Sequence, residues 1–317
     1  MRLKRLASLS LVVLLGLSLL LITARVRATQ TPTFTRKEDV VYGRKYGTAL
    51  TMDVFSPTGS SNGLGVIWVV SGGWVTSHDA IQPASPYAPV GELIKRGYTV
   101  FAVVHGCQPK FTIPEIVGDM NRSVRFIRFH AADYHIDPNR LGITGASAGG
   151  HLSLMQGTAG DGGDPNAKDP IDRVSSRVQA VACFFPPTDF LNYGKTGNVA
   201  DGHGTLKAFR PPFDFHEADP AQGGAFERIT DPAKIHEILA KISPMDQVTP
   251  DDAPSLLIHG DADPLVPIQQ SEVMVAKLKG AGVPAQLIIK KGGSHGWPDM
   301  GNDMPRIVDW FDQRLKK

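Results

Sequence analysis

Gly145-Ala146-Ser147-Ala148-Gly149 decides the fold of this chain, because it follows a strand-like run and opens a helix-like run. The Gly-x-Ser-x-Gly pattern is typical of a sharp strand-to-helix turn that holds its serine in a strained backbone conformation. Small residues two positions either side let the backbone bend this sharply. The turn raises the Ser147 hydroxyl above the strand end, beside a helix N-terminus that favours nearby negative charge. Ser147 is therefore the candidate nucleophile.

Strand-like and helix-like segments alternate on both sides of this turn. Continuous β-rich runs are typical of strands that are covered on both faces. The alternation predicts an α/β chain with a mostly parallel central sheet and helices on both faces. A hairpin over 40–55, turning near Tyr46-Gly47, is expected to precede it, after a loose polar stretch at 29–38. The predicted strands are 66–70, 98–104, 140–144, 178–185, 255–259 and 285–289, and the predicted helices are 90–96, 113–132, 147–158, 231–242, 267–280 and 304–315.

The elbow and the alternation together predict the α/β-hydrolase fold. With 317 residues, 42% of them hydrophobic, the chain is long enough for one large core. Residues 29–317 are expected to form a single domain. An insertion at about 191–240 begins with a long aperiodic stretch that is rich in Gly, Pro and aromatic residues, which predicts a lid-like segment.

Two aspartates after the strand at 255–259 compete for the role of the catalytic acid. In α/β-hydrolases the acid and then the histidine follow the serine along the chain. Asp261 lies just past the strand end, where its carboxylate is placed to cap the turn. Asp263 lies farther along, where its carboxylate is placed to face a loop from the next strand. We favour Asp263 and keep Asp261 as the alternative.

The candidate base is His295, in the loop that follows the last predicted strand. A serine hydroxyl is a poor nucleophile until a histidine takes its proton, and that histidine needs an acid to orient it. Glycines on both sides of His295 let its loop fold over the elbow. The chain has ten histidines, and position alone distinguishes this one. His151 and His259 are expected to be structural.

A second glycine-rich loop supplies the candidate oxyanion hole. The developing negative charge in acyl transfer needs two N–H donors that are already in place. One is expected from Ala148, directly after the nucleophile. The other is expected from Gly72, Gly73 or Trp74, which follow an early strand. The sequence does not choose among these three amides.

Aromatic residues near these loops are candidate pocket walls. Trp74 and Trp297 flank the predicted site, and Trp297 is the candidate substrate-pocket residue. Four phenylalanines of the insertion either line an acyl or sugar pocket or anchor the insertion to the body; they are Phe209, Phe213, Phe215 and Phe226.

Five stretches follow a known pattern of motifs: 50–55, 71–74, 137–152, 259–267 and 293–296. Together they resemble secreted α/β-hydrolase esterases of the kind that includes bifunctional acetyl-xylan/feruloyl esterases and carboxylesterases with a His-Gly-Gly-Gly loop. The resemblance covers roughly residues 40–317. In such families the aspartate of a His-Gly-x-x-Asp-x-x-Val-Pro run is the triad acid, so the resemblance implies Asp263 for that role.

The chain departs from this family pattern in two places. The His-Gly-Gly-Gly loop reads Val70-Ser71-Gly72-Gly73 here, without the histidine. After the next strand, many relatives carry an Asp-Tyr-Arg type segment, whereas this chain has Val104-His105-Gly106-Cys107. The support of the oxyanion loop and the wall of the pocket are therefore expected to differ from those of the family.

The first 28 residues read as a secretory signal peptide. A positive start at Arg2, Lys4 and Arg5 precedes an apolar run at 6–22, and Val26-Arg27-Ala28 provides small residues for cleavage after Ala28. An uncleaved anchor is the alternative, because the run is near the short end of spanning length. The pattern predicts a secreted or periplasmic protein with no stable membrane insertion after cleavage.

The rest of the chain excludes several function classes. The net charge of +2 belongs to the signal segment, and no basic block remains for nucleic acid. No His-Glu-x-x-His run is present, so neither a metal nor a cofactor is expected. An acidic loop at 161–172 is expected to be a solvated surface, with a calcium site as the alternative. The sequence does not decide whether Cys107 and Cys183 are paired, and it is silent on oligomeric state.

Three functions remain in competition. The motifs favour a serine carboxylic-ester hydrolase that acts on small esters or an acylated polysaccharide through an acyl-enzyme. A peptidase of the prolyl-oligopeptidase type shares the elbow and triad, but such enzymes usually carry a β-propeller ahead of the hydrolase domain. A non-catalytic binder on the same scaffold has no need of Ser147, Asp263 and His295 together.

Overall fold

The central sheet is built around the buried strands that the sequence predicts. In the computed structural model, which describes residues 33–85 and 88–317, the strand order is β1-β2-β4-β3-β5-β6-β9-β10. Strands β1 and β2 pair antiparallel, as do β2 and β4, and all the other neighbours pair in parallel. The bounds are β1 (Phe34–Lys45), β2 (Thr48–Pro57), β3 (Gly65–Val69), β4 (Thr99–Val104), β5 (Leu141–Ala146), β6 (Ala180–Phe184), β9 (Ser255–Gly260) and β10 (Ala285–Lys290).

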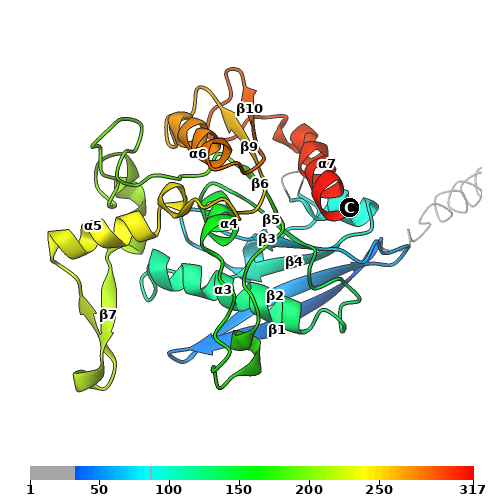
Figure 1. Ribbon diagram of the computed structural model, residues 1–317, viewed down its shortest axis with the longest axis horizontal. Helices are drawn as coiled ribbons and strands as arrows, with labels where there is room; N and C mark the ends of the chain where they lie inside the picture. The colour runs from blue at the N-terminus through cyan, green and yellow to red at the C-terminus, as the bar shows by residue number, and fades with distance from the viewer. Residues whose placement is uncertain (1–32, 86–87) are drawn as a thin grey trace, which may run out of the picture. The chain divides into compact units, whose positions relative to one another are not determined.

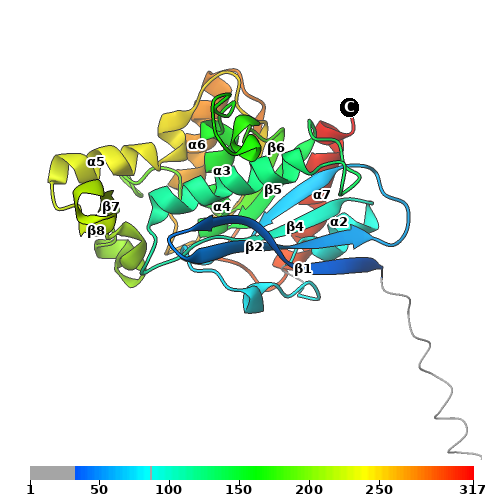
Figure 2. The same cartoon turned by 90° about the horizontal axis from the view of Figure 1, so that it is seen from below.

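Helices cover both faces of this sheet, as Figures 1 and 2 show. Helices α3, α4 and α6 contribute to one buried apolar cluster, and α2 and α7 contribute to the other. The mostly parallel sheet with helices on both faces confirms the predicted α/β-hydrolase fold. The helix bounds are α2 (Val90–Lys95), α3 (Ile113–Phe129), α4 (Ala148–Ala159), α5 (Pro232–Lys241), α6 (Gln269–Gly280) and α7 (Met304–Leu315).

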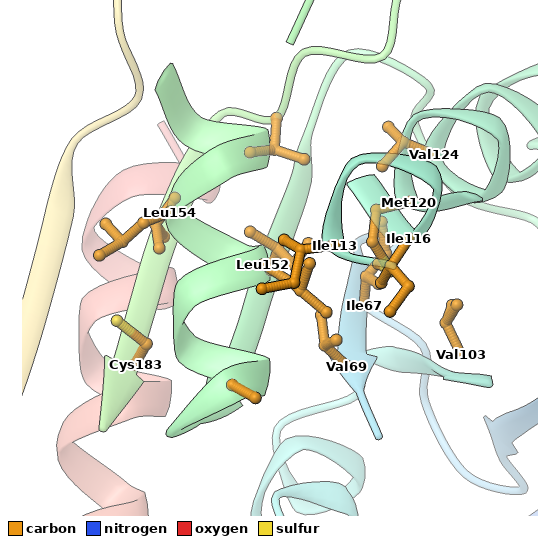
Figure 3. Packing of buried hydrophobic residues seen from close by; sticks show 14 of the residues in the cluster. Ile67, Val69, Val103, Ile113, Ile116, Met120, Val124, Leu152, Leu154 and Cys183 are labelled. Atoms are coloured by element: carbon orange, nitrogen blue, oxygen red, sulfur yellow. The ribbon is translucent and has the colours of Figure 1, made fainter. Parts of the chain in front are cut away.

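Alternating strand residues feed the two apolar clusters. Side chains of successive strand residues point to opposite faces of a sheet. In β3, Ile67 and Val69 belong to the cluster under α3 and α4, whereas Val66 belongs to the cluster under α2 and α7. In Figure 3, α3 and α4 pack their apolar faces over β3 and the neighbouring strands; the labelled residues are Ile67, Val69, Val103, Ile113, Ile116, Met120, Val124, Leu152, Leu154 and Cys183.

Two local expectations were wrong. The stretch predicted to be loose is a strand from Phe34 onward, because β1 pairs with β2 along its length despite its exposed, polar side chains. The insertion also contains a small antiparallel sheet of β7 (His216–Asp219) and β8 (Ala225–Arg228), drawn beside α5 in Figure 1. These strands are only four residues long, and β8 is wholly exposed, so they carry no apolar alternation that a pattern could reveal.

Two further predictions concern the termini and the cysteines. The predicted signal peptide at 1–28 lies outside the described residues, so its cleavage stays a prediction. Within the described part of the chain, no helix has the length and apolar character needed to cross a membrane. Cys107 and Cys183 are both free thiols. Phe34–Lys317 forms one compact unit that includes the insertion.

Candidate active site

Ser147 lies between β5 and α4 in the strained turn that its neighbours predict. Its backbone has φ 54° and ψ −120°, a conformation that L-residues rarely adopt. A Cβ added to Gly145 would lie 2.5 Å from the Gly149 backbone, and one added to Gly149 would lie 2.8 Å from Val69 O. Only glycine fits at either position without a shift of the backbone. The Ser147 N–H donates to Phe184 O at 3.0 Å, which fixes the turn to β6.

His295 connects the serine to a carboxylate from another loop. Its Nε2 lies 2.9 Å from Ser147 Oγ, and its Nδ1 lies 2.8 Å from Asp263 Oδ2. Because an ionised carboxylate only accepts, Nδ1 donates to Asp263 and Nε2 is left to accept the serine proton. The Asp263 side chain is fully buried, whereas the His295 side chain is 22% exposed. The structure thus brings together the three side chains that the sequence assigned to one site.

Asp263 is held ionised by several donors. Its Oδ1 accepts from the Leu265 and Val266 amides at 2.9 Å each, and its Oδ2 lies 3.4 Å from His259 Nε2. Burial raises the pKa of this carboxyl, but the hydrogen bonds from His259, His295 and the Val266 amide outweigh burial and lower its pKa well below the usual range. A charged Asp263 at working pH orients the His295 ring.

The competing aspartate lies elsewhere. Asp261 pairs with Lys291 Nζ at 2.9 Å and accepts from the Gly292 amide at 2.7 Å. These contacts cap the turn after β9, which is the alternative role that the sequence offered. Asp263, and not Asp261, contacts His295.

Of the three candidate backbone amides in the loop after β3, two remain candidate donors to the oxyanion. The Gly72 N–H donates to Val75 O at 2.9 Å, so this amide is engaged, and its candidacy as an oxyanion donor is corrected. Gly73 and Trp74 both have left-handed backbones, with φ 57° and 59°. Ala148 opens α4, and the first N–H groups of a helix have no partner within it. Gly73, Trp74 and Ala148 remain the candidate donors.

The two tryptophans that flank the site are core residues. Trp74 is 2% exposed, and its indole N–H donates to His151 Nδ1 at 3.1 Å. Trp297 is 8% exposed, and its indole N–H donates to Asp303 Oδ2 at 2.9 Å. Trp297 packs against Phe185, and its role as a substrate-pocket wall stays a prediction.

The insertion contacts the loop at 71–74 directly. The Phe209 ring occupies the space beside Gly73, where an added Cβ would lie 2.4 Å from a ring carbon. Phe213 and Phe215 are buried in the main core and anchor the insertion, as one of the two sequence interpretations held. Phe226 is 38% exposed and packs on Tyr46 at a ring-centroid distance of 4.8 Å.

Two residues near the site were missed by sequence reasoning. The Phe185 ring packs on the His295 ring at a centroid distance of 4.5 Å, from a position with φ 34° just after β6. His105 follows β4, and its Nε2 lies 2.9 Å from Ser71 Oγ. Strand ends at the same sheet edge converge, so the position of Phe185 at the end of one predicted strand and of His105 directly after another was the available signal.

The acidic loop is paired with arginines. Arg122 contacts Asp169 and Asp172 at 2.7 and 2.9 Å, and Arg125 contacts Asp161. Among residues 33–85 and 88–317, no group of three or more His, Cys, Asp or Glu side chains is arranged to hold a metal ion.

Sequence comparisons match this chain to a family model and to curated esterases. Residues 52–278 match the BD-FAE family model. Esterase LipQ of Mycobacterium tuberculosis is 25% identical over 217 residues, which cover 68% of this chain and 46% of that protein. The probable carboxylic ester hydrolase LipM of the same organism is 27% identical over 247 residues, covering 76% and 51%. The chain thus spans about half the length of the curated relatives it matches.

Solved structures give the same fold. A truncated form of a carbohydrate esterase from gut microbiota has a TM-score of 0.71 and 26% identity, covering 90% of this chain and 98% of that one. An acetyl ester-xyloside bifunctional hydrolase from Caldicellulosiruptor lactoaceticus has a TM-score of 0.66 and 22% identity, covering 91% and 97%, and it supports the fold alone. These matches confirm the resemblance to α/β-hydrolase esterases.

Proposed function

The chain belongs to the BD-FAE family, and from this premise we propose that it is a serine carboxylic-ester hydrolase. The observation that carries the proposal is the continuous hydrogen-bonded line from Ser147 through His295 to Asp263, with distances of 2.9 and 2.8 Å. The esterase names of its relatives support the same reaction class.

The proposed reaction proceeds through an acyl-enzyme. Ser147 Oγ attacks the ester carbonyl carbon while its proton passes to His295 Nε2. Asp263 orients the ring and stabilises the imidazolium. His295 then protonates the leaving alcohol. A water molecule gives its proton to His295, attacks the acyl carbon and releases the acid and the Ser147 hydroxyl.

Backbone amides are proposed to stabilise the negative oxygen of each tetrahedral intermediate. Ala148 supplies one donor from the start of α4, where the helix N-terminus favours negative charge. Gly73 or Trp74 supplies the other. Both Ser147 and His295 are partly exposed, so an ester can reach them.

The test is turnover of short p-nitrophenyl esters by the protein and by Ser147→Ala. We expect the variant to fold and to lose turnover to near background. A fluorophosphonate should label the wild-type protein at Ser147 and leave the variant unlabelled, because only an activated serine reacts. Ser123→Ala is the matched control, since its hydroxyl contacts only Met120 O on α3. Equal turnover in Ser147→Ala contradicts the proposal.

Acylated carbohydrate is the proposed natural substrate class, beside small esters. Support comes from the carbohydrate esterase of gut microbiota, which matches over most of both chains. An acyl-chain-length series, run beside acetylated xylan, tests this choice. Release of acetate from the xylan supports it, whereas activity on small esters alone contradicts it.

Export across a membrane is also proposed, on the N-terminal pattern of charges, apolar run and small residues at 2–28. Mass spectrometry of the protein from culture medium or periplasm should find Thr29 as the first residue. An intact N-terminus in the membrane fraction would favour the uncleaved anchor.

A further inference from the structure

His105 forms a hydrogen bond with the loop that carries the candidate oxyanion amides. Its Nε2 lies 2.9 Å from Ser71 Oγ, across the gap between the ends of β4 and β3. His105 is 3% exposed, so water does not compete freely for this contact. The histidine that the family pattern places in this loop is Val70 here, a buried apolar residue.

The protons on the His105 ring are set by its neighbours. Nδ1 lies beside Gly106 O, and a carbonyl oxygen only accepts, so Nδ1 carries the hydrogen. Nε2 is then an acceptor, and the Ser71 hydroxyl donates to it. Burial lowers the pKa of His105 to about 4, which keeps the ring neutral at ordinary pH. In this contact the Ser71 hydroxyl is therefore the donor and His105 Nε2 is the acceptor.

The backbone next to His105 is itself fixed. The Gly106 N–H donates to Asp119 Oδ2 at 2.9 Å, and Asp119 pairs with Lys45 Nζ at 2.6 Å. A Cβ on Gly106 would lie 2.6 Å from the Phe111 ring and 2.9 Å from Asp119, so this glycine permits the close packing. His105 is thus a rigid point to which Ser71 is attached.

Ser71 connects His105 to the start of α4. Its carbonyl oxygen is a neighbour of Gly149 at the start of α4, where an added Cβ would lie 3.5 Å away. The opposite end of the same short loop is held by the Trp74 indole, which donates to His151 of α4 at 3.1 Å. Between these two attachments lies the candidate donor Gly73.

We propose that His105 is a positioning residue for ester hydrolysis, which holds the Gly73–Trp74 amides in place through the Ser71 hydroxyl. This proposal rests on the proposed function. His105 contacts this loop from the end of β4, in a chain that has Val70 where the family pattern has a histidine. His105 touches no reacting atom. It stabilises the transition state indirectly, by holding the loop whose amides contact the oxyanion.

The experiment is a double-mutant cycle with Ser71→Ala and His105→Phe, measured as kcat and KM on p-nitrophenyl acetate. We expect either single variant to lose about tenfold in kcat with KM within about twofold, because a displaced oxyanion donor weakens only transition-state binding. The double variant should be no worse than either single one. His105→Gln, which keeps a terminal oxygen that accepts from Ser71, should recover most of the loss.

A transition-state analogue separates positioning from general structural damage. Affinity for a trifluoromethyl ketone should fall by the same factor as kcat, while KM stays unchanged. His130→Gln is the control, since this partly exposed histidine contacts Asp133, Phe126 and Phe129 and none of the candidate site residues, and it should behave as the wild-type protein. If His105→Phe fails to fold, Ser71→Ala decides alone, because removing one hydroxyl creates little strain.

Three results would overturn the proposal. They are an unchanged kcat in Ser71→Ala, losses that multiply in the double variant, and a rise in KM in place of a fall in kcat. Failure of the proposed function is distinguishable, because the unchanged protein would then hydrolyse no ester and take no fluorophosphonate label.

Discussion

On one side of Ser147 in the sheet, the loops after β9 and β10 supply Asp263 and His295; we call this the acid–base side. On the other, the loops after β3 and β4 supply residues 71–74 and His105, which form the oxyanion side. The acid–base side follows the family pattern residue by residue. The oxyanion side departs from it at both loops.

Chemistry explains this difference. Proton transfer needs an imidazole and a carboxylate, so the acid–base side has little freedom in residue type. On the proposed mechanism, the oxyanion side acts through backbone amides, which every residue except proline carries. Any side chain that holds those amides still can serve, and it can come from a neighbouring strand. Supporting residues are therefore free to move in the sequence where reacting ones are not.

The largest effect is expected from Asp263→Asn on the acid–base side. An amide in place of the carboxylate favours the wrong tautomer of His295, so kcat should fall about 10⁴-fold with the fold intact. Asp261→Asn is the matched control two residues away and should stay near the unchanged protein, because Asp261 contacts only Lys291 and Gly292. Steady-state kinetics on a short ester measures both. A larger loss in Asp261→Asn would reverse the two assignments.

On the oxyanion side, Gly73→Ala should cost about 10²-fold in kcat. The new Cβ would meet the Phe209 ring at 2.4 Å, and the residue would keep a left-handed backbone. Gly72→Ala is the control, since nothing lies within 4 Å of its added Cβ. Adding Phe209→Ala to Gly73→Ala should restore part of the activity by removing the clash. Equal kcat values in Gly72→Ala and Gly73→Ala would contradict this prediction, because the loop would then tolerate the added Cβ at both positions.

The two buried tryptophans allow a finer comparison. Trp74→Phe and Trp297→Phe each remove one buried indole donor, which should lower the free energy of unfolding by about 1–3 kcal/mol. Only Trp74→Phe should also lower kcat, by about tenfold, because it frees one end of the oxyanion loop. Chemical denaturation and steady-state kinetics separate the two quantities. A fall in kcat for Trp297→Phe would support the prediction that this residue lines the substrate pocket.

The smallest effect is a pH dependence of stability. Burial lowers the pKa of both His105 and His151 to about 4, below the value of about 6.5 in an unfolded chain. The unfolded state therefore binds more protons between these values, and stability is lost as pH falls through that window. Asp263, with its lowered pKa, loses its contribution only at more acidic pH. Denaturation at about pH 7 and about pH 5 should show the loss, and His105→Gln should reduce it. An unchanged slope in that variant would contradict the assignment.

Motifs with short-range steric causes were readable from the sequence. The elbow at Ser147 needs its two glycines for reasons local to the turn, and the strands around it have continuous apolar runs. Asp263 and His295 were placed by chain order and the family pattern. We expected them to converge on Ser147. In the structure, His295 lies within hydrogen-bonding distance of both Asp263 and Ser147.

Contacts between distant segments were not readable. The engagement of the Gly72 amide depends on the turn that brings Val75 back to it. Trp297 packs against Phe185 because of how the loop after β10 folds, which no local pattern encodes. The β7–β8 pair is held by backbone pairing, with side chains that show no alternation. The His105–Ser71 contact joins two residues 34 apart along the chain.

The strand order also has a consequence for the nascent polypeptide. Translation runs from β1 towards β10, so Ser147 leaves the ribosome 148 residues before His295 does. Until the loop after β10 is made, the serine has no partner to take its proton. On the proposed mechanism, a product stopped before that loop is inert towards esters, and hydrolysis begins only when the last strand is in place.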